Sequence, residues 1–168
     1  MKPIVSIIIG STSDYDVMEK AAKFLDERDI PFEINALSAH RTAEKVMEFA
    51  KNAESRGIKV IIAGAGMAAA LPGAIAAQTT LPVIGVPIKG TFDGLDSVLS
   101  MLQMPPAVPV ATVAVNGAMN AAVLAMEILA LTDNDINKKM HSYKETLKDK
   151  IIKANKDLES KQFKNRVF

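Results

Sequence analysis

The feature that most constrains this chain is a regular alternation of short apolar runs with longer segments of helical periodicity. Residues 4–9 are almost entirely apolar and mostly β-branched, which is typical of a strand buried on both faces of a sheet. Similar signals predict further strands at 31–37, 60–63, 83–86 and 111–115, and helices at 13–29, 42–57, 68–78, 94–102 and 118–131. Strands separated by helices imply right-handed βαβ crossovers and a parallel sheet.

We therefore predict an α/β fold, a three-layer αβα sandwich of the flavodoxin-like kind with a parallel sheet. Residues 1–132 form this domain in the prediction, and residues 133–168 form a long C-terminal helical extension. In sheets of this kind a ligand binds beyond the carboxyl ends of the strands. The candidate site residues are therefore those just after Ile9, Leu37, Ala63 and Val86.

The C-terminal extension carries one apolar stripe. Its members recur at spacings of three and four residues, as on one face of a helix: Ile136, Met140, Tyr143, Leu147, Ile151, Ala154 and Leu158. An apolar stripe of this kind is expected to be buried against another surface, but the periodicity does not show which surface that is. Packing on the chain's own domain and packing on a neighbouring subunit both stay open at this point.

Charge is distributed unevenly along the chain. Residues 1–137 hold 10 basic and 15 acidic side chains, whereas residues 138–168 hold 10 basic and 4 acidic ones. A basic tail can bind nucleic acid, but here the positive charges alternate with Asp149, Asp157 and Glu159, which favours a solvated helix face and no nucleic-acid partner. The chain has no cysteine, no apolar run of membrane-spanning length and no signal-peptide pattern, so we expect a cytoplasmic protein without a membrane partner.

The first candidate segment, Gly10-Ser11-Thr12-Ser13-Asp14, follows the first strand and opens the first helix. The Ser11 and Ser13 hydroxyls and the amides of a helix start can hold a phosphate. Asp14 would repel a phosphate but can accept hydrogen bonds from a sugar hydroxyl. The alternative is an ordinary capped helix start, because Ser and Asp are favoured there anyway.

The second candidate segment, Ser38-Ala39-His40-Arg41, lies on the same predicted edge. Imidazole ordinarily titrates near pH ~6.5, so a histidine there can both donate and accept a proton at neutral pH. The guanidinium of Arg41 is a fixed cationic fork suited to phosphate. A histidine in a loop is often only structural or solvated, but beside an arginine at this edge His40 is a candidate acid-base residue.

The third candidate segment runs from Gly64 to Gly73 after the third strand. Its small side chains let a ligand approach the backbone at Gly64 and Gly66. The spacing imitates a dinucleotide-binding fingerprint, but it occurs in the third βα unit and no acid ends the next strand to hold a ribose. A small-residue helix packed on the sheet is the alternative. We predict no metal site, because Asp14 is the one well-placed carboxylate, and the chain has no G-x-S-x-G elbow.

Taken together, these segments resemble the PurE family, whose members move a carboxyl group on an aminoimidazole ribonucleotide. The resemblance extends to about Ala130. It is carried by Gly10–Asp14, Ser38–Arg41, Ala63–Gly66, Leu71–Gly73, Leu81–Pro87, Asp96-Ser97 and Gln103–Pro105. The Gly-Ala-Gly and Leu-Pro-Gly motifs are similar to those of class I, the mutases, rather than those of class II, the carboxylases that use free CO2.

The resemblance implies an isomerase of purine biosynthesis that interconverts N5-carboxyaminoimidazole ribonucleotide and 4-carboxy-5-aminoimidazole ribonucleotide, with His40 as its acid-base residue and with no metal or other cofactor. It implies a homo-octamer in which the C-terminal helix lies on a neighbour. It also implies that Ser11, Asp14 and Arg41 bind the phosphate and sugar. The full set of expected substrate-binding residues is Ser11, Ser13, Asp14, Ser38, Arg41, Gly64, Gly66 and Met67.

The chain departs from the family pattern at a few positions. The family usually has glycine where Met67 stands and histidine where Ala70 stands, and the loop at 115–120 is slightly shorter than usual. Three other functions therefore stay open. They are a CO2-dependent carboxylase on the same fold, a non-catalytic module that binds nucleotide phosphate, and a reductase.

Overall fold

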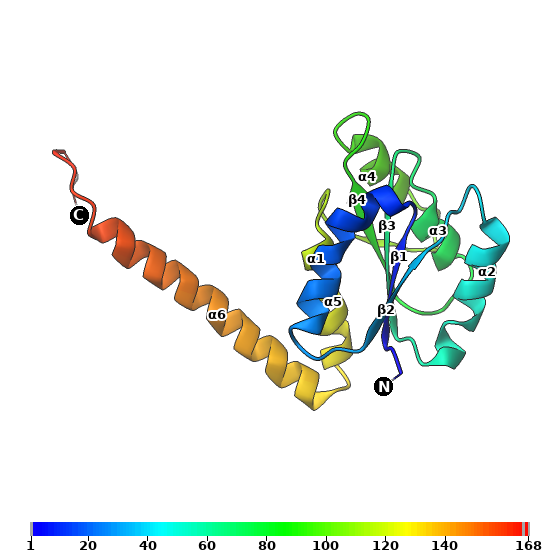
Figure 1. The fold of residues 1–168 in the computed structure, drawn as a ribbon, viewed down its shortest axis with the longest axis horizontal. Coiled ribbons are helices and arrows are strands. Elements are labelled where there is room, and N and C mark those ends of the chain that lie inside the picture. Colours follow the sequence, from blue (N-terminus) through cyan, green and yellow to red (C-terminus); the bar gives the residue numbers. More distant parts are fainter. Residues whose placement is uncertain (1, 166, 168) are drawn as a thin grey trace.

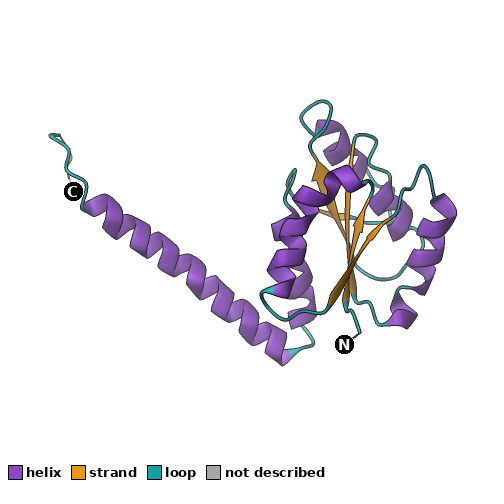
Figure 2. Cartoon of the chain, viewed as in Figure 1, coloured by secondary structure: helices purple, strands orange, loops and turns teal. Residues whose placement is uncertain are grey.

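The computed structural model describes residues 2–165 and 167. Within them, five parallel strands form one sheet in the order β2-β1-β3-β4-β5 (Figures 1 and 2). Their bounds are Val5–Ile9 for β1, Phe32–Ala36 for β2, Val60–Gly66 for β3, Val83–Ile88 for β4 and Ala111–Thr112 for β5. This is the flavodoxin-like strand order, and it confirms the predicted fold class.

Helices cover both faces of the sheet, as Figure 2 shows with the strands between two helical layers. The helices of the domain are α1 (Tyr15–Asp26), α2 (Ala43–Asn52), α3 (Leu71–Ala76), α4 (Leu95–Leu102) and α5 (Ala118–Ala130), with short 3-10 turns η1 (Thr12–Asp14) and η2 (Glu54–Arg56). Helices α1 and α5 share one apolar core with the sheet, while α2, α3 and Met101 of α4 share the other.

Side-chain alternation along the central strand explains the two cores. All five residues of β1 are buried, with Val5, Ile7 and Ile9 in the α1/α5 core and Ile8 in the α2/α3 core. Fully burying one isoleucine contributes roughly 1.5–3 kcal/mol. Ser6 is the one polar residue of β1, and its buried hydroxyl donates a hydrogen bond of 2.9 Å to Glu33 on β2. The near-continuous apolar run thus matches a strand with helices on both sides.

Two predicted elements are shorter than the sequence pattern indicated. Strand β5 pairs with β4 only at Ile84 and Gly85. The Pro87 carbonyl points toward β5 and accepts a hydrogen bond from the Asn116 amide at 2.8 Å. The backbone nitrogen of Pro87 points the same way but carries no hydrogen, so the β4–β5 ladder lacks its next donor. Helix α3 begins at Leu71 rather than at 68, because Met67 has a left-handed backbone (φ 56°) and Pro72 fits the first helical turn.

Helix α6 (Asn134–Glu159) leaves the domain as one straight rod (Figure 1). Its 26 residues span about 39 Å. The Asp133 carboxylate caps the start by accepting hydrogen bonds from the amides of Asp135 (2.9 Å) and Ile136 (3.0 Å). Ile136 and Met140 are the buried residues of this helix within the described chain.

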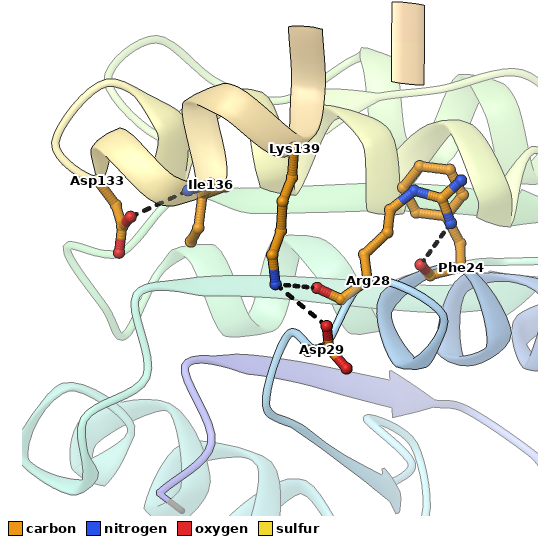
Figure 3. Close-up of polar contacts among 6 residues, drawn as sticks. All are labelled: Phe24, Arg28, Asp29, Asp133, Ile136 and Lys139. Carbon is orange, nitrogen blue, oxygen red and sulfur yellow. Dashed lines mark hydrogen bonds and ion pairs between the residues drawn. The ribbon is translucent and has the colours of Figure 1, made fainter. Parts of the chain in front are cut away.

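Polar contacts join the first turns of α6 to the turn that follows α1 (Figure 3), and ring contacts join α6 to Phe24 and Arg28. The Lys139 ammonium donates to the Arg28 carbonyl at 2.5 Å and lies 3.5 Å from the Asp29 carboxylate. The Arg28 guanidinium lies 3.7 Å from the centre of the Phe24 ring and 4.7 Å from that of Tyr143. From Lys144 to Glu159 the side chains are exposed, so the domain covers the stripe only as far as Tyr143.

Residues 2–165 and 167 contain neither a membrane-spanning helix nor a cluster of metal-ligating side chains. No helix there is long and apolar enough to cross a membrane. In the same residues, no three His, Cys, Asp or Glu side chains gather where they could hold a metal ion.

Candidate active site

The loops after four neighbouring strands line one cavity at the carboxyl edge of the sheet. These loops follow β1, β2, β3 and β4 and gather at the upper end of the domain in Figure 1. The cavity measures about 580 Å³. Its lining residues are Gly10, Ser11, Ser13, Asp14, Ser38, Ala39, His40, Arg41, Ala65, Gly66, Met67, Ala68, Ala69, Ala70, Leu71, Ile88, Lys89 and Gly90. A cavity of this size suits a small nucleotide.

The first loop places two hydroxyls and one buried carboxylate on the cavity wall. The Ser11 hydroxyl accepts hydrogen bonds from the Ser13 amide (3.3 Å) and the Ser13 hydroxyl (2.9 Å). Burial raises the pKa of Asp14, although the Ser13 hydroxyl, the Ser11 amide and the positive charge of Arg41 act in the opposite direction. The geometry therefore offers an acceptor for sugar hydroxyls beside donors for a phosphate.

The second loop is held by a reciprocal pair of hydrogen bonds at the start of α2. The Ser38 amide donates to the Thr42 hydroxyl at 3.0 Å, and that hydroxyl donates to the Ser38 carbonyl at 3.1 Å. His40 lies exposed at the tip of this turn, and its side chain makes no hydrogen bond within the described part of the chain. Both imidazole nitrogens are thus available to a bound molecule.

Arg41 joins the first two loops. Its Nε donates to the Ser38 hydroxyl at 3.2 Å, and its Nη2 donates to the Gly10 carbonyl at 3.2 Å. Two fixed hydrogen bonds orient the guanidinium and leave its other N–H groups for an anion. His40 therefore shares one cavity with the Arg41 guanidinium and with the hydroxyls of Ser11 and Ser13.

The third loop supplies backbone and one long side chain. Gly66 and Met67 line the cavity, whereas Gly64 lies behind the wall. The Gly64 carbonyl accepts a hydrogen bond from the Gly10 amide at 2.9 Å, and a Cβ on Gly64 would lie 2.5 Å from the Met18 sulfur. The structure thus gives Gly64 a supporting position rather than a place on the wall.

The loop after β4 adds Ile88, Lys89 and Gly90 to the cavity wall. These residues follow Val86, at the edge where the sequence predicts a site, but none of the three was among the predicted site residues. Ser97 supports the loop, since its buried hydroxyl bonds the carbonyls of Ile88 (3.1 Å) and Gly94 (2.8 Å). The signal for Lys89 was its position just after a buried strand, at the edge where ligands bind.

The local geometry also bears on the dinucleotide-binding alternative. In that fingerprint the glycines form the turn that opens a helix directly. Here the backbone turns left-handed at Met67, and α3 begins at Leu71 with six residues. This loop therefore lacks the helix start that would receive a pyrophosphate, which disfavours the reductase alternative.

Comparisons with known proteins agree with this geometry. A family model described as AIR carboxylase matches residues 4–150. The chain is 55% identical over 159 residues to the N5-carboxyaminoimidazole ribonucleotide mutase of Pyrococcus horikoshii, which covers 94% of this chain and 90% of that protein. It is 50% identical over 160 residues to the phosphoribosylaminoimidazole carboxylase of Candida glabrata, covering 95% of this chain and 28% of that protein. The crystal structure of Treponema denticola PurE superposes with a TM-score of 0.85 at 35% identity, covering 93% and 98% of the two chains.

Proposed function

The chain belongs to the AIR carboxylase family, and from that premise we propose that it is an isomerase of purine biosynthesis. It interconverts N5-carboxyaminoimidazole ribonucleotide, the carbamate nucleotide, and 4-carboxy-5-aminoimidazole ribonucleotide, the ring carboxylate. The observation that carries the proposal is the shared cavity of His40, Asp14 and Arg41. It gives one ribonucleotide a cation for its phosphate, an acceptor for its sugar and an imidazole for its base.

Binding begins with the phosphate and the sugar. Arg41 is already oriented by Ser38 and Gly10, so it loses little freedom when a phosphate oxygen replaces water at its remaining N–H groups. The hydroxyls of Ser11 and Ser13 donate to the same phosphate, and Asp14 accepts from the ribose hydroxyls. These contacts hold the base beside His40.

The chemistry that follows is a carboxyl transfer in two steps. The carbamate N–C bond breaks, its electron pair stays on the exocyclic nitrogen, and that nitrogen takes a proton from the His40 imidazolium. Carbon 4 of the ring then attacks the released CO2 to form the new C–C bond. Neutral His40 removes the proton from carbon 4, and the electrons of that C–H bond return to the ring.

One imidazole suffices because the proton balance closes. His40 gives one proton in the first step and recovers one in the second, so the cycle needs no net acid or base. The second step also needs CO2 to stay beside the ring, since holding a reactant in place replaces a costly encounter from solution. The walls of the cavity, with the small-residue loop at 65–70, supply that enclosure.

One assay separates the mutase from two alternatives, a carboxylase and a binding module. Purified protein is mixed with the carbamate nucleotide in buffer freed of bicarbonate and CO2, and formation of the ring carboxylate is followed by chromatography. A mutase forms it without added CO2. A carboxylase, the second candidate suggested by the 50% identity to the Candida glabrata enzyme, needs aminoimidazole ribonucleotide and bicarbonate. A binding module forms no product, whether or not bicarbonate is added to the buffer.

The proposal also covers the oligomeric state of the enzyme and its location in the cell. We propose that the enzyme is cytoplasmic, as expected from the sequence pattern, and that it is a homo-octamer, as the family resemblance implies. Leu147 and Ile151, at 39% and 65% exposure on the outer part of α6, support the assembly because they would be covered by a neighbouring copy. Light scattering of the full chain tests it, and a monomer at micromolar concentration would contradict it.

A further inference from the structure

Met67 has an unusual backbone conformation for its residue type. Its φ of 56° lies in the left-handed region, where an L side chain crowds the following carbonyl and where glycine is free of that strain. Six non-glycine residues of the described chain share this region: Asp29, Met67, Phe92, Asp93, Ala107 and Asn116. Of these six, Met67 lines the cavity and the other five do not. A strained residue at a binding site calls for a functional reason.

The Met67 side chain stands at the mouth of the cavity. It is 62% exposed, and its Cγ lies 3.7 Å from the position that a Cβ on Gly90 would occupy. It therefore reaches from the loop after β3 toward the loop after β4. The other residues at 65–70 are glycine and alanine, so Met67 supplies the long side chain of that wall.

We propose that Met67 closes the cavity over the CO2 that forms between the two steps of the reaction and prevents its escape. The inference rests on the proposed function. In the family pattern the long side chain of this wall is the histidine at position 70, whereas this chain has Ala70 there and carries its long side chain at position 67. The left-handed backbone aims the side chain across the mouth, and the flexible thioether folds over the bound base. An exposed apolar side chain gains burial when the nucleotide arrives, which favours the closed arrangement.

The chemistry of the thioether suits this task. CO2 is neutral and has no proton to donate, so an apolar wall confines it without competing for a hydrogen bond. A thioether is only a weak acceptor and leaves the imidazolium proton of His40 for the departing nitrogen. No bond to Met67 forms or breaks, and the electron and proton balance of the transfer is unchanged.

The test measures CO2 escape for each product formed. Unlabelled carbamate nucleotide is supplied in buffer containing ¹³C-bicarbonate, and mass spectrometry gives the ¹³C fraction of the ring carboxylate at early conversion. A reaction without enzyme corrects for spontaneous loss of the carbamate. Four proteins are compared: the wild type, Met67→Gly, Met67→Leu and Ala107→Gly.

Each variant isolates one part of the inference. Met67→Gly removes the side chain and the strain together. Met67→Leu restores an apolar side chain of similar size. Ala107→Gly relieves the same left-handed strain (φ 74°) in a residue that does not line the cavity. Both glycine variants should melt no lower than the wild type, because glycine adopts these angles freely.

The expected result is a low ¹³C fraction for the wild type and for Ala107→Gly, a several-fold higher fraction for Met67→Gly, and recovery of most of the retention in Met67→Leu. A Met67→Gly product with the wild-type ¹³C fraction would overturn the role of Met67 and leave the mutase proposal standing. A fully labelled wild-type product would overturn retention and favour the carboxylase. A wild type that forms no ring carboxylate at all would overturn both proposals.

Discussion

The cavity at the carboxyl edge of the sheet and the outer part of α6 are both surfaces that this chain does not cover by itself, but their chemistry is opposite. The cavity is concave, and polar groups such as Arg41 and the buried Asp14 converge on its walls among small apolar side chains. The outer part of α6 is convex, and its stripe is apolar at Leu147 and Ile151. Converging polar groups in a hollow suit a small polar ligand, whereas a row of aliphatic side chains suits another protein surface.

The two regions also differ in how they are held. The cavity loops are tied to one another by hydrogen bonds such as those of Arg41 to Ser38 and to Gly10. Helix α6 meets the domain at its first turns, where Lys139 bonds the turn after α1 and Tyr143 packs against Phe24 of α1. Changes in the cavity should therefore alter chemistry without altering assembly, and changes in the outer part of α6 should do the reverse.

The largest expected effect separates the two regions at once. Replacing His40 by Asn should lower kcat roughly 10²–10⁴-fold, because it removes the group that carries the proton. Ligand affinity and assembly should stay near those of the wild type. The matched control is His141→Asn, which changes the second of the two histidines, on α6. Equal losses in the two variants would contradict the assignment.

The next effect belongs to α6. The double variant Leu147→Glu/Ile151→Glu should lower the assembly constant by at least about 100-fold, since fully burying each aliphatic side chain contributes roughly 1.5–3 kcal/mol. Light scattering measures the mass, and circular dichroism checks that the domain stays folded. The control Lys148→Glu/Lys150→Glu makes two neighbouring changes outside the stripe. An unchanged mass in the double variant would show that the stripe is not an interface.

Arg41→Ala should raise KM roughly 10–100-fold, because hydrogen bonds to a charged group contribute about 1.5–3 kcal/mol. The phosphate-free nucleoside separates affinity for the phosphate from general damage. The wild type should bind nucleotide much more tightly than nucleoside, and the variant should lose most of this preference, keeping the part that Ser11 and Ser13 contribute. If the variant keeps the full preference for nucleotide, Arg41 does not bind the phosphate.

The smallest expected effect is a gain in stability at Asp14. Burial raises its pKa above the ordinary 3.8, so the folded chain binds a proton more tightly than the unfolded chain does. Stability therefore falls as pH rises from about 3.8 through the raised pKa, and the penalty is fully present above it. Asp14→Asn should be more stable than the wild type at pH 8, and this gain should shrink toward pH 4. Urea unfolding across this range measures it, and a gain independent of pH would contradict the account.

Much of the fold follows from the sequence because periodicity reports burial directly. The almost entirely apolar run of β1 predicted a strand between two helical layers, and the edge rule then brought Asp14 and His40 to one side of the sheet. The early end of β5 was not predictable, because the effect of Pro87 depends on which neighbour its missing N–H faces. That direction is fixed by the register between strands, which a single sequence does not give.

Whether a predicted site residue lines the cavity was visible in the sequence where side-chain chemistry decides, and not where backbone geometry decides. Ser11, Asp14, His40 and Arg41 carry groups whose chemistry is visible in the sequence, and they line one cavity. The supporting place of Gly64 depends on the Met18 sulfur that packs against it from α1. For α6, the apolar stripe predicted a buried helix face, but the sequence does not show that the domain covers this face only as far as Tyr143, because that limit depends on where the domain ends.

The central claim is that one ribonucleotide binds in the cavity with its base against His40, and the two histidines of the chain allow a direct test. Histidine labelled with ¹³C at the ring carbon between its nitrogens gives two signals, which His40→Asn and His141→Asn assign. Addition of the ring carboxylate should shift the His40 signal and leave that of His141 in place. A His40 signal that does not move when the protein is saturated with the nucleotide would contradict the account.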